Sequence, residues 1–325
     1  VLEEHDRQTG SDYARRYLHR LGEWGRCSIV HAKEFDSDWL PIQRGQSNGE
    51  DGSHGMAGRV ESILLETNDG TLVSVPTSLN CTTTYVLLEQ ERWFERELSF
   101  LLDWLKPGMN AVDIGANVGV YSLAMARCVS PGGSVFAFEP GSENRRNLEV
   151  GRSANRIRNL CISASAVAES DRTGWLRIMD SGDLNTLVEG TEPQIGAEPV
   201  EVKSIDTLEH EQHWPSIDFL KVDAEGQERN IILGGRRFLE QQSPLLMFEM
   251  RHVDAPALDI RPLLGEMGYS VFRLTGDAAL LIPLADADPV DPFELNVFAA
   301  KQDRAARLAD SGLLAWGTEP HRLSA

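Results

Sequence analysis

The chain has 325 residues, 41% of them hydrophobic and 25% charged, which is ordinary for a globular protein of one large domain or two small ones. Its formal net charge of −19 disfavours a broad phosphate-binding surface, so we expect no nucleic-acid partner. The four cysteines are widely spaced and form no C-x-x-C pair, which argues against a zinc cluster and against a disulfide framework.

Targeting signals are weak in this sequence. No apolar run approaches the roughly 18 residues that a membrane-spanning helix needs. The first six residues are too acidic and polar for a secretory signal. We therefore expect a cytoplasmic protein with no membrane partner, and the sequence leaves homo-oligomerisation open.

The N-terminal part divides into two segments before the main fold. Residues 1–58 form an extension, in which Ser11 to Trp24 has the pattern of a helix and residues 45–58 have the Gly/Ser-rich composition of a loop. A solvated connector is a better explanation of that loop than a substrate lid. Residues 59–89 are predicted to contain a β-hairpin and a connector, because two apolar runs flank Asn68-Asp69-Gly70.

Strand and helix patterns alternate over residues 90–302. This alternation predicts a Rossmann-like α/β domain with a parallel, doubly wound sheet, followed by a C-terminal tail at 303–325. The expected helices cover residues 85–105, 120–127, 142–150, 227–239 and 260–267, and the expected strands cover residues 111–114, 134–138, 160–167, 174–179, 217–222, 244–248, 269–272 and 294–300.

The turn from Gly115 to Gly119 joins the first of these strands to a helix. Its glycines let the backbone approach a ligand, and the helix N-terminus favours polar or anionic groups. Either a dinucleotide or S-adenosylmethionine fits such a turn. Asn117 replaces the middle glycine that a dinucleotide pyrophosphate requires, which favours S-adenosylmethionine. Glu139, at the tip of the second strand, suits the ribose hydroxyls of either ligand.

Several motifs follow one another in a fixed order along the chain: Val112–Gly119, Phe138–Pro140, Ser204–Leu208, Phe219–Gly226, Leu246–Glu249 and Asn296–Ala299. Together they resemble the FkbM-type methyltransferases. The resemblance runs from about Phe94 to Lys301, and it implies a class I methyltransferase fold that uses S-adenosylmethionine, mostly to methylate hydroxyl oxygens of sugars and secondary metabolites.

This resemblance assigns a donor-binding set. Asp113 and the backbone of Gly115, Asn117 and Gly119 would hold the methionine end of the donor. Glu139 would accept hydrogen bonds from the ribose, with Pro140 and Asn144 nearby. Ala166 and Val167 would lie near the adenine.

The acceptor side leaves more alternatives. Lys221, Asp223 and Glu225 alternate at the tip of one strand, so strand geometry would put them on one side, as a proton acceptor, an acceptor-binding site or a structural ion-pair cluster. His252 is a second candidate base, although a lone histidine is more often inert. Asp223 and Glu249 end neighbouring strands and could ligate Mg²⁺, which the chemistry does not require.

The sequence therefore predicts an S-adenosylmethionine-dependent O-methyltransferase acting on a small hydroxylated acceptor. Three alternatives remain: an N-methyltransferase on the same fold, an NAD-dependent oxidoreductase, and a non-catalytic protein that binds S-adenosylmethionine.

Overall fold

The computed structural model describes residues 62–179, 185–188, 196–224, 226–249, 260–275, 279–285 and 296–315. The extension 1–58, with its expected helix and loop, lies outside these ranges. No helix among the described residues is long and apolar enough to span a membrane.

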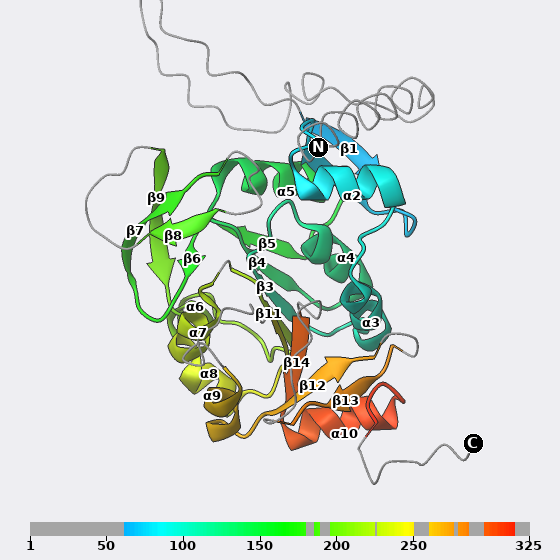
Figure 1. Ribbon diagram of the computed structural model, residues 1–325, viewed down its shortest axis with the longest axis vertical. Coiled ribbons are helices and arrows are strands. Elements are labelled where there is room, and N and C mark those ends of the chain that lie inside the picture. Colours follow the sequence, from blue (N-terminus) through cyan, green and yellow to red (C-terminus); the bar gives the residue numbers. More distant parts are fainter. Residues whose placement is uncertain are drawn as a thin grey trace, which may run out of the picture.

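An eight-stranded mixed sheet forms the centre of the fold (Figure 1). In spatial order the strands are β13 (Leu281–Pro283), β12 (Ser270–Leu274), β14 (Asn296–Ala300), β11 (Leu245–Glu249), β10 (Phe219–Val222), β3 (Ala111–Ile114), β4 (Val135–Phe138) and β5 (Leu160–Ser163). The five strands from β11 to β5 run parallel. Beyond β11, β14 runs antiparallel to β11, β12 antiparallel to β14, and β13 antiparallel to β12. The expectation of an α/β, Rossmann-like sheet is confirmed, with an antiparallel edge added to the parallel part.

Helices cover both faces of this sheet, because its strands alternate apolar side chains to each side. The helices are α2 (Thr82–Gln90), α3 (Arg96–Trp104), α4 (Val120–Cys128), α5 (Ser142–Ala154), α6 (Ile205–Glu211), α7 (Glu228–Gly234), α8 (Arg236–Gln241), α9 (Arg261–Glu266) and α10 (Gln302–Asp310). Ala111, Phe219 and Met247 belong to the core on the face of α3, α4 and α10, whereas Val112 and Leu220 belong to the core on the face of α6 to α9.

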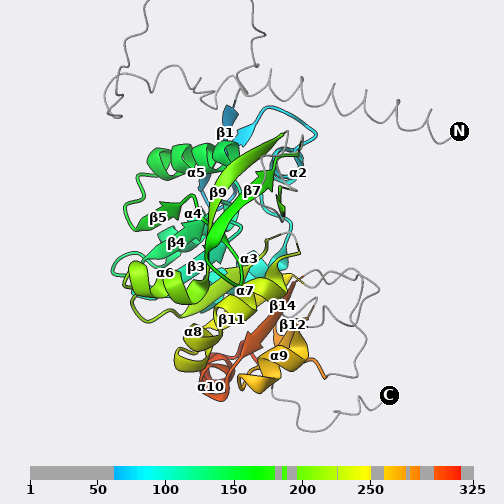
Figure 2. The same ribbon diagram turned by 90° about the vertical axis from the view of Figure 1, so that its left-hand side faces the viewer.

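Two smaller sheets accompany the main one. The predicted hairpin is present as β1 (Ser62–Glu66) and β2 (Leu72–Pro76), and β2 is tied to α5 by a hydrogen bond from Ser74 Oγ to Asn147 Oδ1 at 2.8 Å. A four-stranded sheet lies beside the β4–β5 end of the main sheet (Figures 1 and 2). Its strands, in spatial order, are β6 (Ala166–Val167), β9 (Ala197–Lys203), β7 (Arg172–Arg177) and β8 (Thr186–Val188).

Some expected elements are divided in the structure. The helical region 85–105 is two helices, because Glu91 adopts a left-handed backbone conformation at the end of α2 and Glu95 is extended before α3. The strand expected at 160–167 is split between β5 and β6, which belong to different sheets, and that expected at 174–179 is β7 of the small sheet. The helix expected at 227–239 is divided at Gly235 into α7 and α8. Within the expected tail, α10 continues to Asp310.

The direction of strand connections reverses between β3 and β10. From β3 the chain moves to β4 and β5 on one side, and later elements fill β10 and β11 on the other. In open α/β sheets, ligands bind beyond the carboxyl ends of the strands at such a switch point. The ends of β3, β4 and β10 are therefore where a site is expected.

Gly115 lets the loops after β3 and β10 meet. It has φ +78°, and a Cβ built on it would lie 1.7 Å from the backbone oxygen of Asp223. The glycine is thus required by a contact between two loops of the fold, in addition to any ligand.

We expect Gly115→Ala to lower the free energy of unfolding by more than about 3 kcal/mol, because a backbone contact and a left-handed conformation are both violated. Denaturant unfolding would measure the loss. The matched control is Gly108→Ala: Gly108 has φ +91° but nothing within 4 Å of the position that a Cβ would take, so only about 1–2 kcal/mol of backbone strain is expected there. Equal losses in the two variants would contradict the close contact.

Candidate active site

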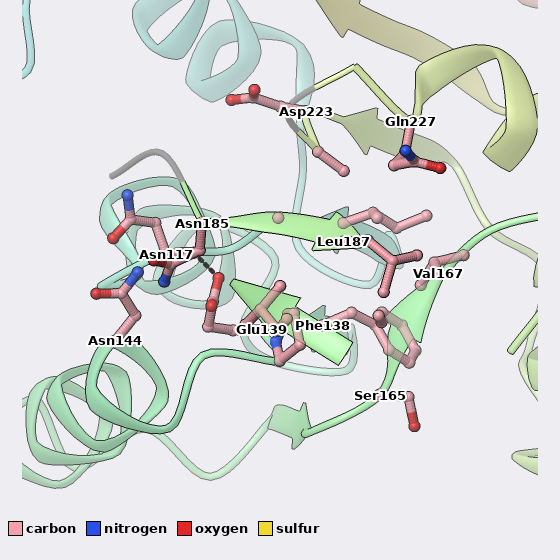
Figure 3. A pocket seen from close by; sticks show the side chains of 16 residues that line it. Asn117, Phe138, Glu139, Asn144, Ser165, Val167, Asn185, Leu187, Asp223 and Gln227 are labelled. Carbon is pink, nitrogen blue, oxygen red and sulfur yellow. Dashed lines mark hydrogen bonds between the residues drawn. The ribbon is translucent and has the colours of Figure 1, made fainter. Parts of the chain in front are cut away.

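A pocket opens at the carboxyl edge of β3, β4 and β10 (Figure 3). Its empty space measures about 720 Å³, which includes open solvent at the mouth of the pocket. Seven of the nine predicted donor-binding residues line it: Gly115, Asn117, Glu139, Pro140, Asn144, Ala166 and Val167. The remaining lining residues are Ile114, Phe138, Ser165, Leu176, Asn185, Leu187, Asp223, Ala224 and Gln227.

The loop after β3 is fixed by backbone hydrogen bonds and by Asn117. The amides of Gly115 and Ala116 both donate to the Phe138 carbonyl, at 3.0 and 3.1 Å. Asn117 has φ 50°, a left-handed conformation that asparagine tolerates better than most residues. Its Oδ1 accepts a hydrogen bond from the Val118 amide at 2.7 Å. Local backbone geometry therefore explains why asparagine occupies the position that is glycine in a dinucleotide loop.

Glu139 is the central polar group of the pocket. Its Oε2 accepts a hydrogen bond from the Asn117 amide at 2.8 Å (Figure 3). Its Oε1 accepts one from the Gly141 amide, also at 2.8 Å. The residue is only 5% exposed, and burial raises the pKa of its carboxyl to about 7, against the opposing effect of those two amides and of Arg145. Two fixed amides leave each oxygen a further lone pair for a ligand hydroxyl. Asn144, in the first turn of α5, lies beside it.

The other wall of the pocket is apolar. Phe138 and Val167 come from β4 and β6, and Leu176 and Leu187 come from β7 and β8. The contributions of Leu176, Asn185 and Leu187 were not anticipated, because the sequence did not reveal that β7 and β8 form a separate sheet. The apolar alternation around Leu176 was the available signal.

Two predicted donor-binding residues do not line the pocket. Gly119 precedes α4 with φ +94°, and a Cβ there would lie 2.1 Å from Leu148 Cδ1, so its place in the structure is a helix-packing contact. Asp113 is fully buried. Its Oδ2 accepts a hydrogen bond from Ser122 Oγ at 2.5 Å, and burial raises the pKa of its carboxyl, opposed by Lys221 and Ser122.

Asp113 instead takes part in an ion-pair cluster with Lys221 and Asp223. The β3–β10 register places Lys221 directly beside Asp113. Lys221 Nζ lies 3.6 Å from Asp113 Oδ1 and donates to Asp223 Oδ2 at 2.9 Å. Burial lowers the pKa of this lysine, but the two carboxylates outweigh burial and raise it. Of the three residues, Asp223 alone lines the pocket, and its side chain is 36% exposed.

Glu228 shapes the loop after β10, a role that sequence analysis missed. Its Oε1 accepts hydrogen bonds from the amides of Ala224 and Gly226, at 3.0 and 3.1 Å. The side chain is buried, and burial raises the pKa of its carboxyl. An acidic residue in the first turn of a helix after a glycine was the signal that could have identified it.

The remaining predicted residues are distributed as follows. Glu225 and His252 lie outside the described residues, so their roles stay predictions. Glu249 ends β11, and burial, together with the charges of Asp223 and Glu228, raises the pKa of its carboxyl to about 7. Within the described ranges, no group of three or more His, Cys, Asp or Glu side chains is arranged to hold a metal ion. The Mg²⁺ site at Asp223 and Glu249 therefore stays a prediction.

The strand order, the reversal between β3 and β10 and the pocket at that point define a Rossmann-like fold of the class I methyltransferase type. Residues 113–271 match the methyltransferase FkbM domain family. This match confirms the resemblance to the FkbM-type methyltransferases seen in the motifs.

Solved structures with similar folds include other methyltransferases, and no curated protein matches the chain. The FkbM methyltransferase of Methylobacillus flagellatus is 15% identical with a TM-score of 0.41, and the match covers 69% of this chain and 55% of that one. A SAM-dependent O-methyltransferase from Thermotoga maritima is 17% identical with a TM-score of 0.40, covering 75% and 78% of the two chains. A Streptococcus mutans protein described as a putative methyltransferase, in complex with SAH, is 9% identical with a TM-score of 0.38, covering 63% and 95%. The chain thus spans just over half the length of its Methylobacillus relative.

The raised pKa of Glu139 makes a testable contribution to stability. Because this pKa is about 7 in the folded state, against 4.5 for an exposed glutamate, the contribution is fully present below pH 4.5 and is lost as the pH rises through 7. Between pH 4.5 and 7 the free energy of unfolding should therefore fall because Glu139 loses its proton. In Glu139→Gln that fall should be smaller by on the order of 3 kcal/mol. Denaturant unfolding at several pH values would measure it, with Glu149→Gln, exposed on α5, as the control. If the unfolding free energy of Glu139→Gln depended on pH as that of the unaltered protein does, the raised pKa of Glu139 would be refuted.

Proposed function

We propose that this protein transfers a methyl group from S-adenosylmethionine to a hydroxyl oxygen of a small acceptor such as a sugar or secondary metabolite. The observation that carries the proposal is Glu139. It is a buried carboxylate at the tip of β4, held by two backbone amides and facing a pocket beside an apolar wall.

The residues present fit the donor. Glu139 would accept hydrogen bonds from the ribose hydroxyls, with Asn144 beside it. Phe138 and Val167 would contact the adenine. The polar loop at Gly115 and Asn117 would face the methionine end. When bound, S-adenosylmethionine supplies an electrophilic methyl group on a sulfonium, which is already a good leaving group.

The same loop disfavours a nicotinamide dinucleotide. A pyrophosphate needs bare backbone at the middle position of the loop. Here that position carries the Asn117 side chain, which lines the pocket. The Asn117 amide, which a pyrophosphate would need as a donor, is already bound to Glu139.

On the acceptor side, Asp223 is the proposed proton acceptor. It lines the pocket, and its carboxylate is held by Lys221. Lys221 itself is only 3% exposed, and its raised pKa keeps it an ammonium ion, so it cannot serve as the base. Its part is to orient Asp223 and to balance the charges of Asp113 and Asp223. Orientation of the acceptor hydroxyl against Asp223 would provide most of what methyl transfer requires from the protein.

The electrostatics of this side favour an acceptor without phosphate. Asp223 lies within electrostatic range of the carboxylates of Glu228 and Glu249. The charge of Lys221 is already shared between Asp113 and Asp223. A neutral polyol or phenol therefore fits this environment better than a nucleotide-linked or phosphorylated molecule.

Calorimetry with S-adenosylmethionine, S-adenosylhomocysteine and NAD tests the donor. We expect the first two to bind and NAD not to bind. Glu139→Ala should weaken S-adenosylhomocysteine about 10- to 100-fold, because charge-assisted hydrogen bonds to the ribose are lost. Asp223→Ala should leave that affinity within about two-fold, since its side chain is assigned to the acceptor. Equal losses in the two variants would overturn this division of roles, and NAD binding would favour an oxidoreductase.

A screen of neutral hydroxylated acceptors, with amines and phosphorylated sugars alongside, tests the reaction. We expect S-adenosylhomocysteine to form with a hydroxylated acceptor, and Asp223→Ala to lower kcat about 100-fold, as loss of a general base does. Methylation of amines alone would make this an N-methyltransferase. Donor binding without turnover on any acceptor would indicate a non-catalytic protein. Loss of turnover on chelation, restored by Mg²⁺, would support the Asp223–Glu249 metal site.

A further inference from the structure

Tyr121 connects the start of α3 to the ion-pair cluster at the pocket. It lies in the first turn of α4, and its hydroxyl donates a hydrogen bond to Glu95 Oε2. The ammonium group of Lys221 lies over its ring, 5.1 Å from the ring centroid. Neither Tyr121 nor Glu95 lines the pocket.

The surroundings of Lys221 explain why an aromatic ring is placed there. The ammonium group is buried and is contacted by Asp223 on one side and Asp113 on another. A buried ammonium ion is stable only when its remaining surface also meets electron-rich groups. The face of an aromatic ring is such a group. Glu95 adds a third negative charge within range of Lys221 and holds the ring by its hydroxyl.

A second tyrosine in the same fold provides a comparison. The Nζ of Lys301 lies over the ring of Tyr269, 5.2 Å from its centroid, and Tyr269 Oη donates to the Leu239 carbonyl at 3.4 Å. Lys301 donates to the Glu240 carbonyl, and neither residue lines the pocket. The two lysine–tyrosine pairs are thus alike in geometry, but only the Tyr121 pair leads to a carboxylate that lines a pocket.

We propose that Tyr121 and Glu95 are positioning residues for the methyl-transfer site: they hold the Lys221 ammonium group against Asp223, so that the Asp223 carboxylate keeps one orientation at the pocket wall. The inference rests on the proposed function only for the role of Asp223. The network itself exists whether or not methyl transfer occurs.

The ammonium group offers a direct readout that needs neither donor nor acceptor. The chain has five lysines, so nitrogen-15 lysine labelling gives a simple NMR spectrum. We expect the Lys221 ammonium hydrogens to exchange with solvent about tenfold faster in Tyr121→Leu, because the ring that covers them is removed. Tyr121→Phe should restore most of the protection, and Glu95→Gln, a smaller change at a half-buried residue, should give an intermediate rate. Tyr269→Leu should alter the Lys301 signal and not that of Lys221.

An unchanged Lys221 signal in both Tyr121→Leu and Glu95→Gln would overturn the inference. So would equal disturbance of Lys221 by Tyr269→Leu, since the effect would then reflect general destabilisation. Thermal unfolding of each variant identifies one that does not fold. If Tyr121→Leu does not fold, an unchanged Lys221 exchange rate in Glu95→Gln overturns the inference.

Turnover on the acceptor found in the screen supplies the second readout. We expect Glu95→Gln to lower kcat about fivefold, to leave KM for S-adenosylmethionine within about twofold, and to have no further effect when Asp223 is already alanine, because coupled residues are not additive. An equal loss with and without Asp223 would overturn the positioning role. Absence of turnover on every acceptor would overturn the proposed function instead, and the ammonium result would still decide whether Tyr121 and Glu95 position Lys221.

Discussion

The ion pairs of the buried Lys221 ammonium group hold together the two strands, β3 and β10, whose ends meet at the candidate site. The ammonium group joins β10 to β3 through Asp113 and reaches the pocket through Asp223. Removing an ammonium ion from water costs several kcal/mol, and here that cost is offset by two carboxylates and an aromatic face. The two carboxylates also raise the pKa of Lys221, so its side chain stays an ammonium ion and continues to donate to Asp223. The structural ion pair and the carboxylate that we propose as the proton acceptor therefore belong to one cluster.

The carboxylate on the proposed donor side is held in a different way. Glu139 is held by two backbone amides, with no lysine or arginine side chain donating to it among the described residues. Arg145 contacts the backbone carbonyls of Glu139 and Pro140 rather than the carboxylate. Backbone donors fix the direction of the carboxyl oxygens without using up their negative charge, which suits recognition of neutral hydroxyl groups. The raised pKa of Glu139 is the consequence of this burial without a paired cation.

Sequence patterns predicted the parts of this fold that depend on local chemistry. The apolar runs of β3, β4 and β10 and the position of Glu139 followed from residue types and spacing. The resemblance to the FkbM-type methyltransferases supplied further pocket residues, among them Asn144, Ala166 and Val167. What could not be predicted depends on which strands pair. The residues of β7 were predicted as an ordinary strand, and those of β8 were not predicted as a strand at all. Only the pairing of β7 with β8 in a separate sheet brings Leu176 and Leu187 to the pocket. The sequence also did not show that Asp113 lies beside Lys221, because the register of β3 and β10 sets that pairing. Its donor-binding role stays a prediction.

The contact between Gly115 and Asp223 links the two halves more closely than either half alone indicates. The Asp223 amide donates to the Ile114 carbonyl at 3.1 Å, one residue before the donor loop begins. A shift of the loop after β3 would therefore move the backbone of Asp223. A shift of Asp223 would in turn disturb Lys221 and, through it, Asp113 on β3. Methyl transfer requires the donor and acceptor to be aligned within a fraction of an ångström. The contact between the loops after β3 and β10 has no space for even one methyl group, so neither loop can move toward the other. Such a contact is a physical means of holding that alignment.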